Sequence, residues 1–510
     1  MKTRSSARII SLVLLTAFIL SACVPEAPTT PALPEPTAAD SQPTLPPIPT
    51  EKPAPTGYIT YLTQSGDTLP VVAAHFGVEQ HQIKYEGDVD REALLPPGTR
   101  LYVRDLLDET SNPEILILDS DVVFSPSTVG FDILAFAQEQ GGFLGQLEEQ
   151  MTRGLTPAAQ IVNDLALEFS INQRILLSLM EYESGWVTRK PADEFELSYP
   201  FGWEKRDRTG TYFQTGWAIT QLSQGYYGWR DGSLTELAFT DGTTLRLSPF
   251  LNAGTVAVMH MLAQIHDRAE WEAALYAPGN LVDVHLDLFG DPQARANGVE
   301  PLFPAGTEQP LLNLPIPVNE KWNLTGGPHS AWGRYGPRAA LDFAPPLDRP
   351  GCGNSQRWTT AAAAGRVVRA GNGVVVLDLE MDGYEQTGWV LVYMHIANSE
   401  RVQVGDVLEQ DDRIGHPSCE GGSSSGIHIH IARKFNGEWV LADGGLPFVL
   451  SGYRAKNGEE PCDYAWWGWC EGSLSNGEYT AVADPFGNFW TRIIRPESRP
   501  EFFYTPTPKK

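Results

Sequence analysis

Short runs of alternating apolar and polar residues dominate the chain between residues 319 and 450. Turn residues separate these runs, a pattern that predicts an antiparallel β-sheet. One run, IHIHIA at residues 427–432, places His428 and His430 on one face of a strand and its isoleucines on the other. The two imidazoles, about 6.6 Å apart along the strand, can share a cleft as two metal ligands or as one ligand and one acid/base group. Further strands are expected at RVVRA (366–370), GVVVLDLEM (373–381), GWVLVYMHI (388–396) and GEWVLA (437–442).

Between residues 155 and 300 the apolar positions follow the 3.6-residue period of α-helices. TPAAQIVNDLALEFS (156–170) predicts one helix, and INQRILLSLMEYESGW (171–186) predicts a second that ends at Gly185. Glu183 lies on or beside the apolar stripe of this second helix. Because desolvation favours a neutral carboxyl group, Glu183 has a reason to hold the raised pKa that a general acid requires.

The flanking segments show weaker patterns. Residues 57–104 predict a small α+β unit, with a strand, a turn at Gly66–Asp67, a short helix ended by Gly77 and a returning strand at LLPPGTRLYV (94–103). EILILDSDVVFSP (114–126) indicates a strand and FDILAFAQEQGGFLGQLEEQM (131–151) a helix, but neither carries recognisable chemistry. Residues 301–318 are marked by prolines, as in a linker.

Composition places the chain among multidomain exported proteins. At 510 residues it is too long for one core, and its net charge of −26 argues against a nucleic-acid partner. The first 22 residues combine basic residues with an apolar run of twelve, which is typical of a secretory signal. Residues 24–56 contain eleven prolines and few large apolar side chains, which indicates an extended tether.

The five cysteines fit an exported, lipid-anchored chain. LSAC at 20–23 resembles the lipobox of bacterial lipoproteins, and this likeness implies cleavage before Cys23 and lipid attachment to its thiol. Four cysteines remain, and they allow three disulfide pairings. Cys462–Cys470 is the natural local pair, and Cys352–Cys419 would then follow. Metal binding by these thiols is the alternative, although no CxxC spacing supports it.

A resemblance to LysM modules covers about 48 residues of the chain. GDTL (66–69), FGV (76–78) and PPGTRLYV (96–103) lie in the order that these modules show. The likeness implies a βααβ unit that binds N-acetylglucosamine-containing glycans, with Gly66, Asp67 and Thr68 as contact residues. YEGD after Lys84 departs from the Asn-rich stretch that is usual there.

The helical region resembles lysozyme-like lytic transglycosylases through MEYESGW (180–186). The resemblance makes Glu183, rather than Glu181, the catalytic acid, because a serine follows it. GWAITQLSQGYY (216–227) and ALYAPGN (274–280) match the cleft segments of these enzymes only weakly. The alternative is a helical domain without this activity.

Three segments of the C-terminal region resemble zinc endopeptidases of the lysostaphin and LytM type, which cut peptidoglycan peptides. These segments are AALDFAPP (339–346), YMHIA (393–397) and GHPSCEGGSSSGIHIHIA (415–432). The commoner branch of that family places a histidine ligand four residues before the aspartate, where this chain has Arg338. His329 lies thirteen residues before Asp342, and that spacing resembles the staphylolysin and beta-lytic branch.

On this likeness, His329, Asp342 and His430 are the ligands of a catalytic Zn²⁺, which wants three protein ligands and an open water position. His395 and His428 are then catalytic histidines. His416 and the glycine- and serine-rich segment 420–426 are expected to lie in loops near the site.

These interpretations predict a multidomain chain with a small α+β module, a mostly α middle domain and an antiparallel β metalloendopeptidase domain. The predicted function is peptidoglycan hydrolysis at the bacterial cell envelope, with membrane attachment through Cys23 and a possible second, glycan-cleaving activity. The alternative is a catalytically inactive peptidoglycan-binding regulator of other cell-wall hydrolases. The expected segments are a signal peptide (1–22), a tether (23–56), a LysM-like module (57–104), a connecting region (105–154), a lysozyme-like domain (155–300), a linker (301–318), a metalloendopeptidase domain (319–450) and a C-terminal extension with a disulfide loop (451–510).

Overall fold

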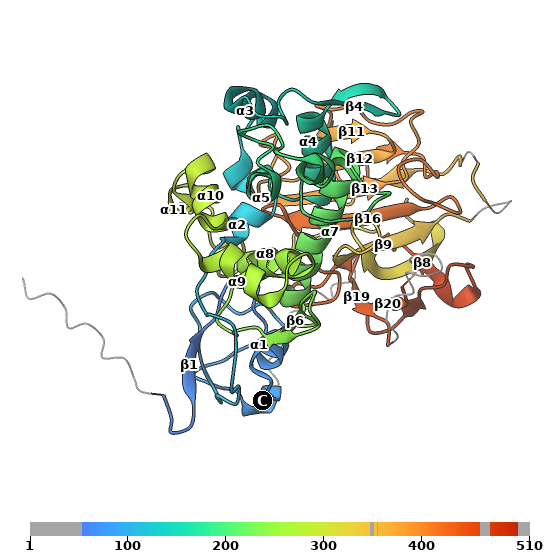
Figure 1. Ribbon diagram of the computed structural model, residues 1–510. Coiled ribbons are helices and arrows are strands. Elements are labelled where there is room, and N and C mark those ends of the chain that lie inside the picture. The colour runs from blue at the N-terminus through green and yellow to red at the C-terminus, as the bar shows by residue number, and fades with distance from the viewer. Residues whose placement is uncertain (1–53, 347–350, 354, 460–469, 498–510) are drawn as a thin grey trace, which may run out of the picture. The chain divides into compact units, whose positions relative to one another are not determined.

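The computed structural model describes residues 54–346, 351–353, 355–459 and 470–497 (Figure 1). The expected signal peptide, Cys23, most of the tether and Cys462 lie outside the described residues. All described residues belong to one compact unit, Ala54–Lys510. Within them, no helix is both long enough and apolar enough to cross a membrane.

The LysM-like region contains one α-helix instead of the expected two. Its elements are β1 (Ile59–Leu62), α1 (Leu69–Phe76), the 3₁₀ turn η1 (Gln80–Gln82), β2 (Lys84–Tyr85) and β3 (Arg100–Val103), with strand order β1-β3-β2. Thr68 caps α1 and Gly77 ends it in a left-handed conformation, as the sequence predicts. The second helix reduces to η1 because the residues after it have no apolar periodicity and become extended at Lys84.

The middle region is mostly helical and contains both helices predicted for residues 156–186. Ile161 and Leu165 of α4 are buried, as are Ile175 and Leu179 of α5. The expected strand at 114–126 is instead the short helix α2, and the expected helix at 131–151 stops at Gly141 and is followed by a hairpin. The elements are α2 (Asp119–Val122), η2 (Pro126–Thr128), α3 (Ile133–Gln140), β4 (Glu148–Met151), β5 (Gly154–Pro157), α4 (Ala158–Phe169), α5 (Gln173–Ser184), α6 (Glu194–Ser198), α7 (Thr211–Arg230), β6 (Glu236–Ala238), β7 (Thr244–Arg246), α8 (Ala253–Ala263), α9 (Arg268–Tyr276), α10 (Leu281–Phe289) and α11 (Pro292–Ala296).

A large antiparallel sheet forms the C-terminal region, with strand order β14-β11-β12-β13-β16-β9-β8-β22 and β17 paired to β16. All the strands predicted between 366 and 442 are present in it. Its strands are β8 (Lys321–Ser330), β9 (Arg338–Ala344), β11 (Gly365–Gly371), β12 (Val374–Asp378), β13 (Trp389–Met394), β14 (Val407–Leu408), β16 (Ile429–Phe435), β17 (Glu438–Trp439) and β22 (Arg492–Ile494). The remaining elements are β10 (Thr359–Thr360), β15 (Arg413–Gly415), β18 (Val449–Leu450), β19 (Tyr453–Asn457), β20 (Gly472–Ser475), β21 (Thr480–Val482) and η3 (Phe489–Thr491).

Both faces of this sheet are covered. On one face, Val376 and Val392 share a hydrophobic cluster with the helices of the middle region, and Figure 1 shows α4 and α7 against these strands. On the other face, Leu377 and Leu391 pack in a second cluster with residues 312–316 of the expected linker. The helices and the sheet therefore share one core, and residues 301–318 contribute to the packing.

Arg230 at the end of α7 joins three regions of the chain through buried polar contacts. Its guanidinium lies 2.9 Å from a carboxylate oxygen of Asp119 in α2 and 2.9 Å from one of Glu438 in β17. It also donates to the carbonyl of Ser65 in the LysM-like region and to the hydroxyl of Tyr226. Because these groups are almost fully buried, loss of the arginine leaves two carboxylates without their cation.

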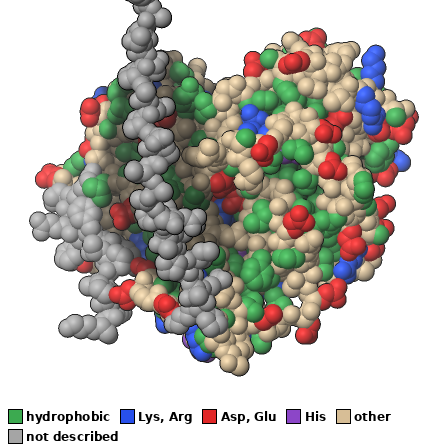
Figure 2. Space-filling model, turned by 90° about the vertical axis from the view of Figure 1, so that its left-hand side faces the viewer, with side chains coloured by type: hydrophobic (Ala, Val, Ile, Leu, Met, Phe, Trp, Pro, Cys, Tyr) green, Lys and Arg blue, Asp and Glu red, His purple; other side chains and the backbone are tan. Residues whose placement is uncertain are grey.

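The surface reflects the acidic composition. Figure 2 shows Asp and Glu side chains scattered over one face, with fewer Lys and Arg. A chain of net charge −26 gains little long-range attraction to an anionic polymer.

Candidate metal centre

Strand register brings the predicted ligands together. In the antiparallel pairing of β16 with β9, His430 lies directly opposite Asp342. The pairing of β8 with β9 shifts register between Gly326 and His329, which places His329 opposite Ala340. A register shift of this kind changes the direction in which a side chain points. Here the imidazole of His329 points toward Asp342.

The two glycines before His329 are required by close packing. A Cβ atom on Gly326 would lie 2.8 Å from a carboxylate oxygen of Asp342, and one on Gly327 would lie 2.6 Å from the carbonyl of Glu471. Gly326 and Gly327 therefore let β8 approach both Asp342 and the segment around Glu471 closely.

Three ligand atoms converge in the resulting site. Nε2 of His329 lies 3.0 Å from Nδ1 of His430, and Oδ1 of Asp342 lies 3.3 Å and 3.2 Å from these two nitrogens. All three ligand atoms lie within 4.8 Å of one another. Two imidazoles and one carboxylate are the kind of ligands that a catalytic zinc site uses.

The hydrogen bonds behind the imidazoles fix which nitrogen faces the site. Nδ1 of His329 lies 2.8 Å from the carbonyl of Gly327, and Nε2 of His430 lies 3.0 Å from the carbonyl of Ala331. A carbonyl only accepts, so these nitrogens carry the protons and the opposite ones present lone pairs to each other. Oδ1 of Asp342 is buried with no hydrogen-bond partner. Three electron-pair donors thus meet without a proton between them, which fits a bound cation.

The pKa shifts agree with a site that attracts positive charge. Burial opposes ionisation of Asp342, but nearby His329 and His428 hold the pKa of its carboxyl well below the usual range. Burial lowers the pKa of His329, and the negative charge of Asp342 outweighs this and raises it. Burial lowers the pKa of His430, which favours the neutral form that binds metal.

His395 and His428 stand beside the ligands with their rings 4.3 Å apart. Nδ1 of His395 donates to the carbonyl of Glu420 at 2.8 Å, and Nδ1 of His428 donates to that of Gly426 at 2.9 Å. Both histidines therefore present Nε2 as an acceptor. His395 follows β13 in a left-handed conformation with φ of 63°, a strained geometry that is common at functional positions. Burial and the neighbouring histidines lower its pKa to about 3, so the ring is neutral at physiological pH.

These five residues line a cleft of about 1030 Å³. The glycine- and serine-rich segment 421–426 forms one wall, as expected from the sequence, and residues 331–334 form another. Asp164, Leu167 and Glu168 of α4 also line it, a contribution that the sequence analysis missed. The spacing of these three residues places them on one face of the helix. Nothing in the sequence distinguishes this face from an ordinary solvent-exposed helix face.

The other predicted site residues lie elsewhere. Cys352 and Cys419 form a disulfide, and Cys470 is disulfide-bonded. His416 bonds to the carbonyl of Arg357 at 2.7 Å and is not among the residues that line the cleft.

Glu183 is enclosed at the end of α5. Its carboxylate lies 3.0 Å from Nε2 of His266, and a Cβ atom on Gly202 would lie 2.8 Å from it. Burial lowers the pKa of His266, but the hydrogen bond and charge of Glu183 outweigh this and raise it. The Glu183 carboxyl group is therefore enclosed and bonded to His266 within the protein.

Asp67 and Thr68 are buried, and Gly66 is partly buried. Asp67 is buried and accepts hydrogen bonds from the Tyr61 hydroxyl and the Gln64 amide, each at 2.7 Å. Burial raises the pKa of Asp67 to about 6. Gly66 and Thr68 line a second cleft of about 730 Å³, between α7 and residues 438–446.

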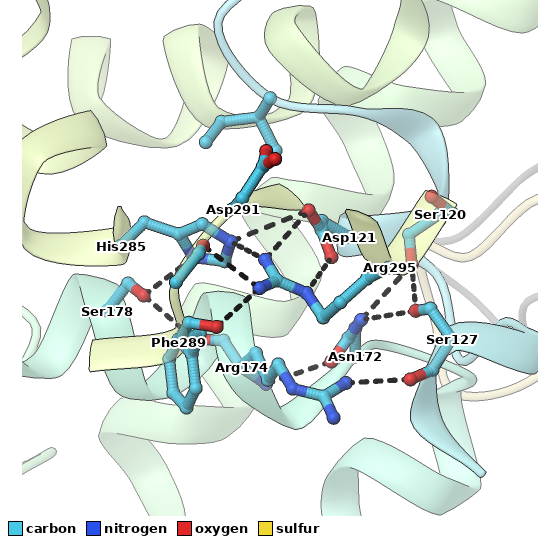
Figure 3. A network of polar contacts seen from close by, with 12 residues as sticks. Ser120, Asp121, Ser127, Asn172, Arg174, Ser178, His285, Phe289, Asp291 and Arg295 are labelled. Carbon is cyan, nitrogen blue, oxygen red and sulfur yellow. Dashed lines mark hydrogen bonds and ion pairs between the residues drawn. The ribbon is translucent and has the colours of Figure 1, made fainter. Parts of the chain in front are cut away.

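A buried Ser–His–Asp arrangement in the middle region does not form a hydrolase triad (Figure 3). Ser178 Oγ lies 2.9 Å from Nδ1 of His285, and Nε2 of that ring lies 3.5 Å from Asp121. Arg295 donates to Nε2 at 2.9 Å, so Nδ1 carries the ring proton and donates to Ser178. The imidazole cannot accept the serine proton, and the hydroxyl donates to the carbonyl of Arg174. The network is structural.

Comparisons with known proteins find similarity to a protease and to a metalloendopeptidase. The family model described as LasA, N-terminal domain, matches residues 115–302. Protease LasA of Pseudomonas aeruginosa (strain UCBPP-PA14) is 27% identical over 297 residues, covering 54% of this chain and 66% of LasA. Beta-lytic metalloendopeptidase of Achromobacter lyticus is 30% identical over 155 residues, covering 28% of this chain and 37% of that enzyme. Among solved structures, the M23 metalloprotease pseudoalterin is 22% identical, with a TM-score of 0.28, covering 38% of this chain and 100% of that one.

The chain is therefore homologous to LasA and to beta-lytic metalloendopeptidase, as its motifs predicted. It spans less than two thirds of the length of these two relatives. The LasA match to residues 115–302 contains the whole segment expected to be lysozyme-like, 155–300. The likeness to lytic transglycosylases gains no support from these matches.

Proposed function

We propose that the protein is a zinc-dependent endopeptidase that hydrolyses the peptides of peptidoglycan. The observation that carries this proposal is the convergence of lone pairs from His329, Asp342 and His430. Homology to a protease and to a beta-lytic metalloendopeptidase supports the same activity.

The three ligands leave room for water and substrate in the cleft. A bound zinc ion supplies a Lewis acid that polarises the scissile carbonyl and lowers the pKa of water. His329 and His430 hold their lone pairs toward the ion through the hydrogen bonds to Gly327 and Ala331. Asp342 adds the negative charge that a dication requires.

His395 and His428 move the protons of the reaction. The Nε2 atom of either ring accepts a proton from the attacking water and, once protonated, donates to the leaving amine or to the developing oxyanion. Because burial keeps the His395 ring neutral, its Nε2 atom offers a lone pair to a hydrogen-bond donor in the cleft. The hydrogen bonds from Nδ1 keep both rings in the orientation that these transfers need.

We also propose that lipid on Cys23 anchors the protein to a membrane of the bacterial cell envelope. We propose that the LysM-like region contacts glycan through Gly66 and Thr68, which line the second cleft, whereas Asp67 is buried. We do not extend the proposal to glycan cleavage, because the Glu183 carboxylate is enclosed by Gly202 and His266.

The competing proposal is a regulator that binds the cell wall without cutting it. Loss of metal ligands would favour that class, and the presence of all three argues against it. Digestion of purified peptidoglycan, followed by mass spectrometry of the fragments, separates the two. New peptide amino termini that disappear with a chelator and return with Zn²⁺ support the endopeptidase. Unchanged peptidoglycan after incubation with zinc-loaded protein supports the regulator.

A further inference from the structure

Three aromatic side chains stand in solvent beside the metal cleft. They lie in residues 485–490, between β21 and the end of η3. Phe486 is 89% exposed, Phe489 71% and Trp490 41%, and the last two rings meet edge to face with centroids 4.9 Å apart. Pro485, next to Phe486, lines the cleft. Single exposed apolar residues are common on proteins, but a group of large rings in one place marks an interaction site.

This aromatic turn is held against the strand that carries His329. The amide of Asp484 donates to the carbonyl of Leu324 at 3.3 Å, and its carboxylate accepts from the amide of Phe486 at 2.8 Å. The hydroxyl of Thr491 donates to Asn323 at 3.0 Å. Beyond the turn, β22 pairs with the first residues of β8. The rings are thus placed in advance relative to the metal ligands, which limits the entropy lost when a ligand binds.

The aromatic turn and α4 contact β8 and its following loop on opposite sides of His329. Leu324 contacts the turn, whereas Trp332 packs against Phe169 at the end of α4, with ring centroids 6.5 Å apart. A polymer lying in this cleft would meet the aromatic turn on the side of His329 away from α4.

The chemistry of the turn favours sugar rings over charged groups. Exposed aromatic faces stack on the flat apolar faces of pyranose rings, and the neighbouring amides of Asn323 and Asn488 offer hydrogen bonds to hydroxyl and acetamide groups. The acidic chain does not attract an anionic polymer by its net charge, so stacking and neutral hydrogen bonds must supply the binding.

We propose that Phe486, Phe489 and Trp490 form a glycan subsite that binds the N-acetylhexosamine rings of peptidoglycan next to the peptide to be cut. This inference rests on the proposed peptidoglycan substrate. On this proposal, the C-terminal extension binds the glycan beside the peptide to be cut.

The test compares two substrates with the full chain and with the variant Phe486→Ala/Phe489→Ala/Trp490→Ala. One substrate is insoluble peptidoglycan and the other is a short cross-bridge peptide without sugar. We expect KM for peptidoglycan to rise about tenfold or more, while kcat/KM for the peptide stays within about twofold. The matched control Phe195→Ala/Tyr212→Ala/Phe213→Ala removes rings of the middle region that are 46%, 44% and 45% exposed, and it should leave both unchanged.

Binding of the N-acetylglucosamine tetramer, measured by titration calorimetry, tests the subsite without cleavage. Weaker binding by the triple variant and by the single variant Phe486→Ala supports it; the single variant removes a side chain with few contacts and should fold. Equal binding by all forms, or none by the wild type, contradicts the subsite even if the protein cuts peptides. If the triple variant loses binding to phosphatidylglycerol vesicles but binds the tetramer as the wild type does, the rings bind a membrane and the proposal is overturned. Failure to cut either substrate despite normal tetramer binding would instead contradict the proposed endopeptidase and leave the subsite supported.

Discussion

Nε2 of His329 lies 3.0 Å from Nδ1 of His430, although 101 residues separate them in the chain. The other ring nitrogen of each histidine donates a hydrogen bond to a backbone carbonyl, that of Gly327 or Ala331. The two nitrogens that face each other therefore both present lone pairs. Such an arrangement is stable only with a positive charge between the donors. The proposed endopeptidase activity requires that a metal ion supplies this charge.

Removal of the two non-ligand histidines should separate metal binding from catalysis. We expect His395→Ala and His428→Ala each to lower kcat by about 100-fold or more, because general acid–base groups contribute that much. Zinc content should stay at the wild-type level, since neither ring is a ligand. Steady-state kinetics on a cross-bridge peptide, with metal analysis of the same samples, measures both.

His416→Ala is the matched control, because His416 bonds to Arg357 away from the residues that line the cleft. It should keep kcat within about twofold of the wild type. Full activity in either His395→Ala or His428→Ala would remove that residue from the mechanism.

Arg230 should be among the residues most important for stability. Arg230→Met leaves Glu438 and Asp119 buried without their cation, and the expected loss is about 3–5 kcal/mol of unfolding free energy. Arg268→Met removes an exposed cation that pairs with Glu272, and its expected cost is below about 1 kcal/mol. Urea unfolding of the two variants compares them directly. Equal costs would show that the Arg230 network does not stabilise the fold.

Stability should fall in mild acid because of His75. Burial against Trp229 lowers the pKa of His75 from 6.5 to about 3 in the folded state. As the pH falls below 6.5, His75 binds a proton in the unfolded chain but stays neutral in the folded chain. The unfolding free energy therefore decreases. The loss from this group at pH 4.5 is about 2–3 kcal/mol.

His75→Gln should therefore show a smaller drop in unfolding free energy between pH 7 and pH 4.5 than the wild type. His81→Gln, at an exposed position in η1, serves as the control and should keep the wild-type drop. Denaturant titrations at the two pH values give the numbers. Identical drops in all three proteins would contradict the burial effect on His75.

The strands and the cluster of histidines in the cleft could be predicted because they depend on local patterns. Alternation within IHIHIA places Ile429 and Ile431 in the core, where both are 0% exposed, and leaves His428 and His430 in the cleft. The spacing between His329 and Asp342 singled out His329 as a candidate ligand, and the structure brings it beside Asp342 and His430, although Arg338 stands where another branch has its first histidine.

Contacts between distant segments were not predictable. The pairing of His430 with Asp342 is a matter of strand register, and the sequence of neither strand specifies it alone. Glu183 has the motif of a catalytic acid, but it is closed off by Gly202 from a later turn and paired with His266 from beyond α8. The role of Glu168 in the cleft wall likewise follows from tertiary packing of α4 on the sheet.

The most direct test of the account is the zinc stoichiometry of the purified full chain by plasma mass spectrometry. We predict one zinc per chain in the wild type and in the control His81→Gln. His329→Ala and Asp342→Ala should each lose most of the metal after dialysis against a weak chelator, because two ligands do not hold a dication as three do. Stoichiometric zinc in both ligand variants, or none in a zinc-saturated wild type, would contradict a zinc site formed by His329, Asp342 and His430.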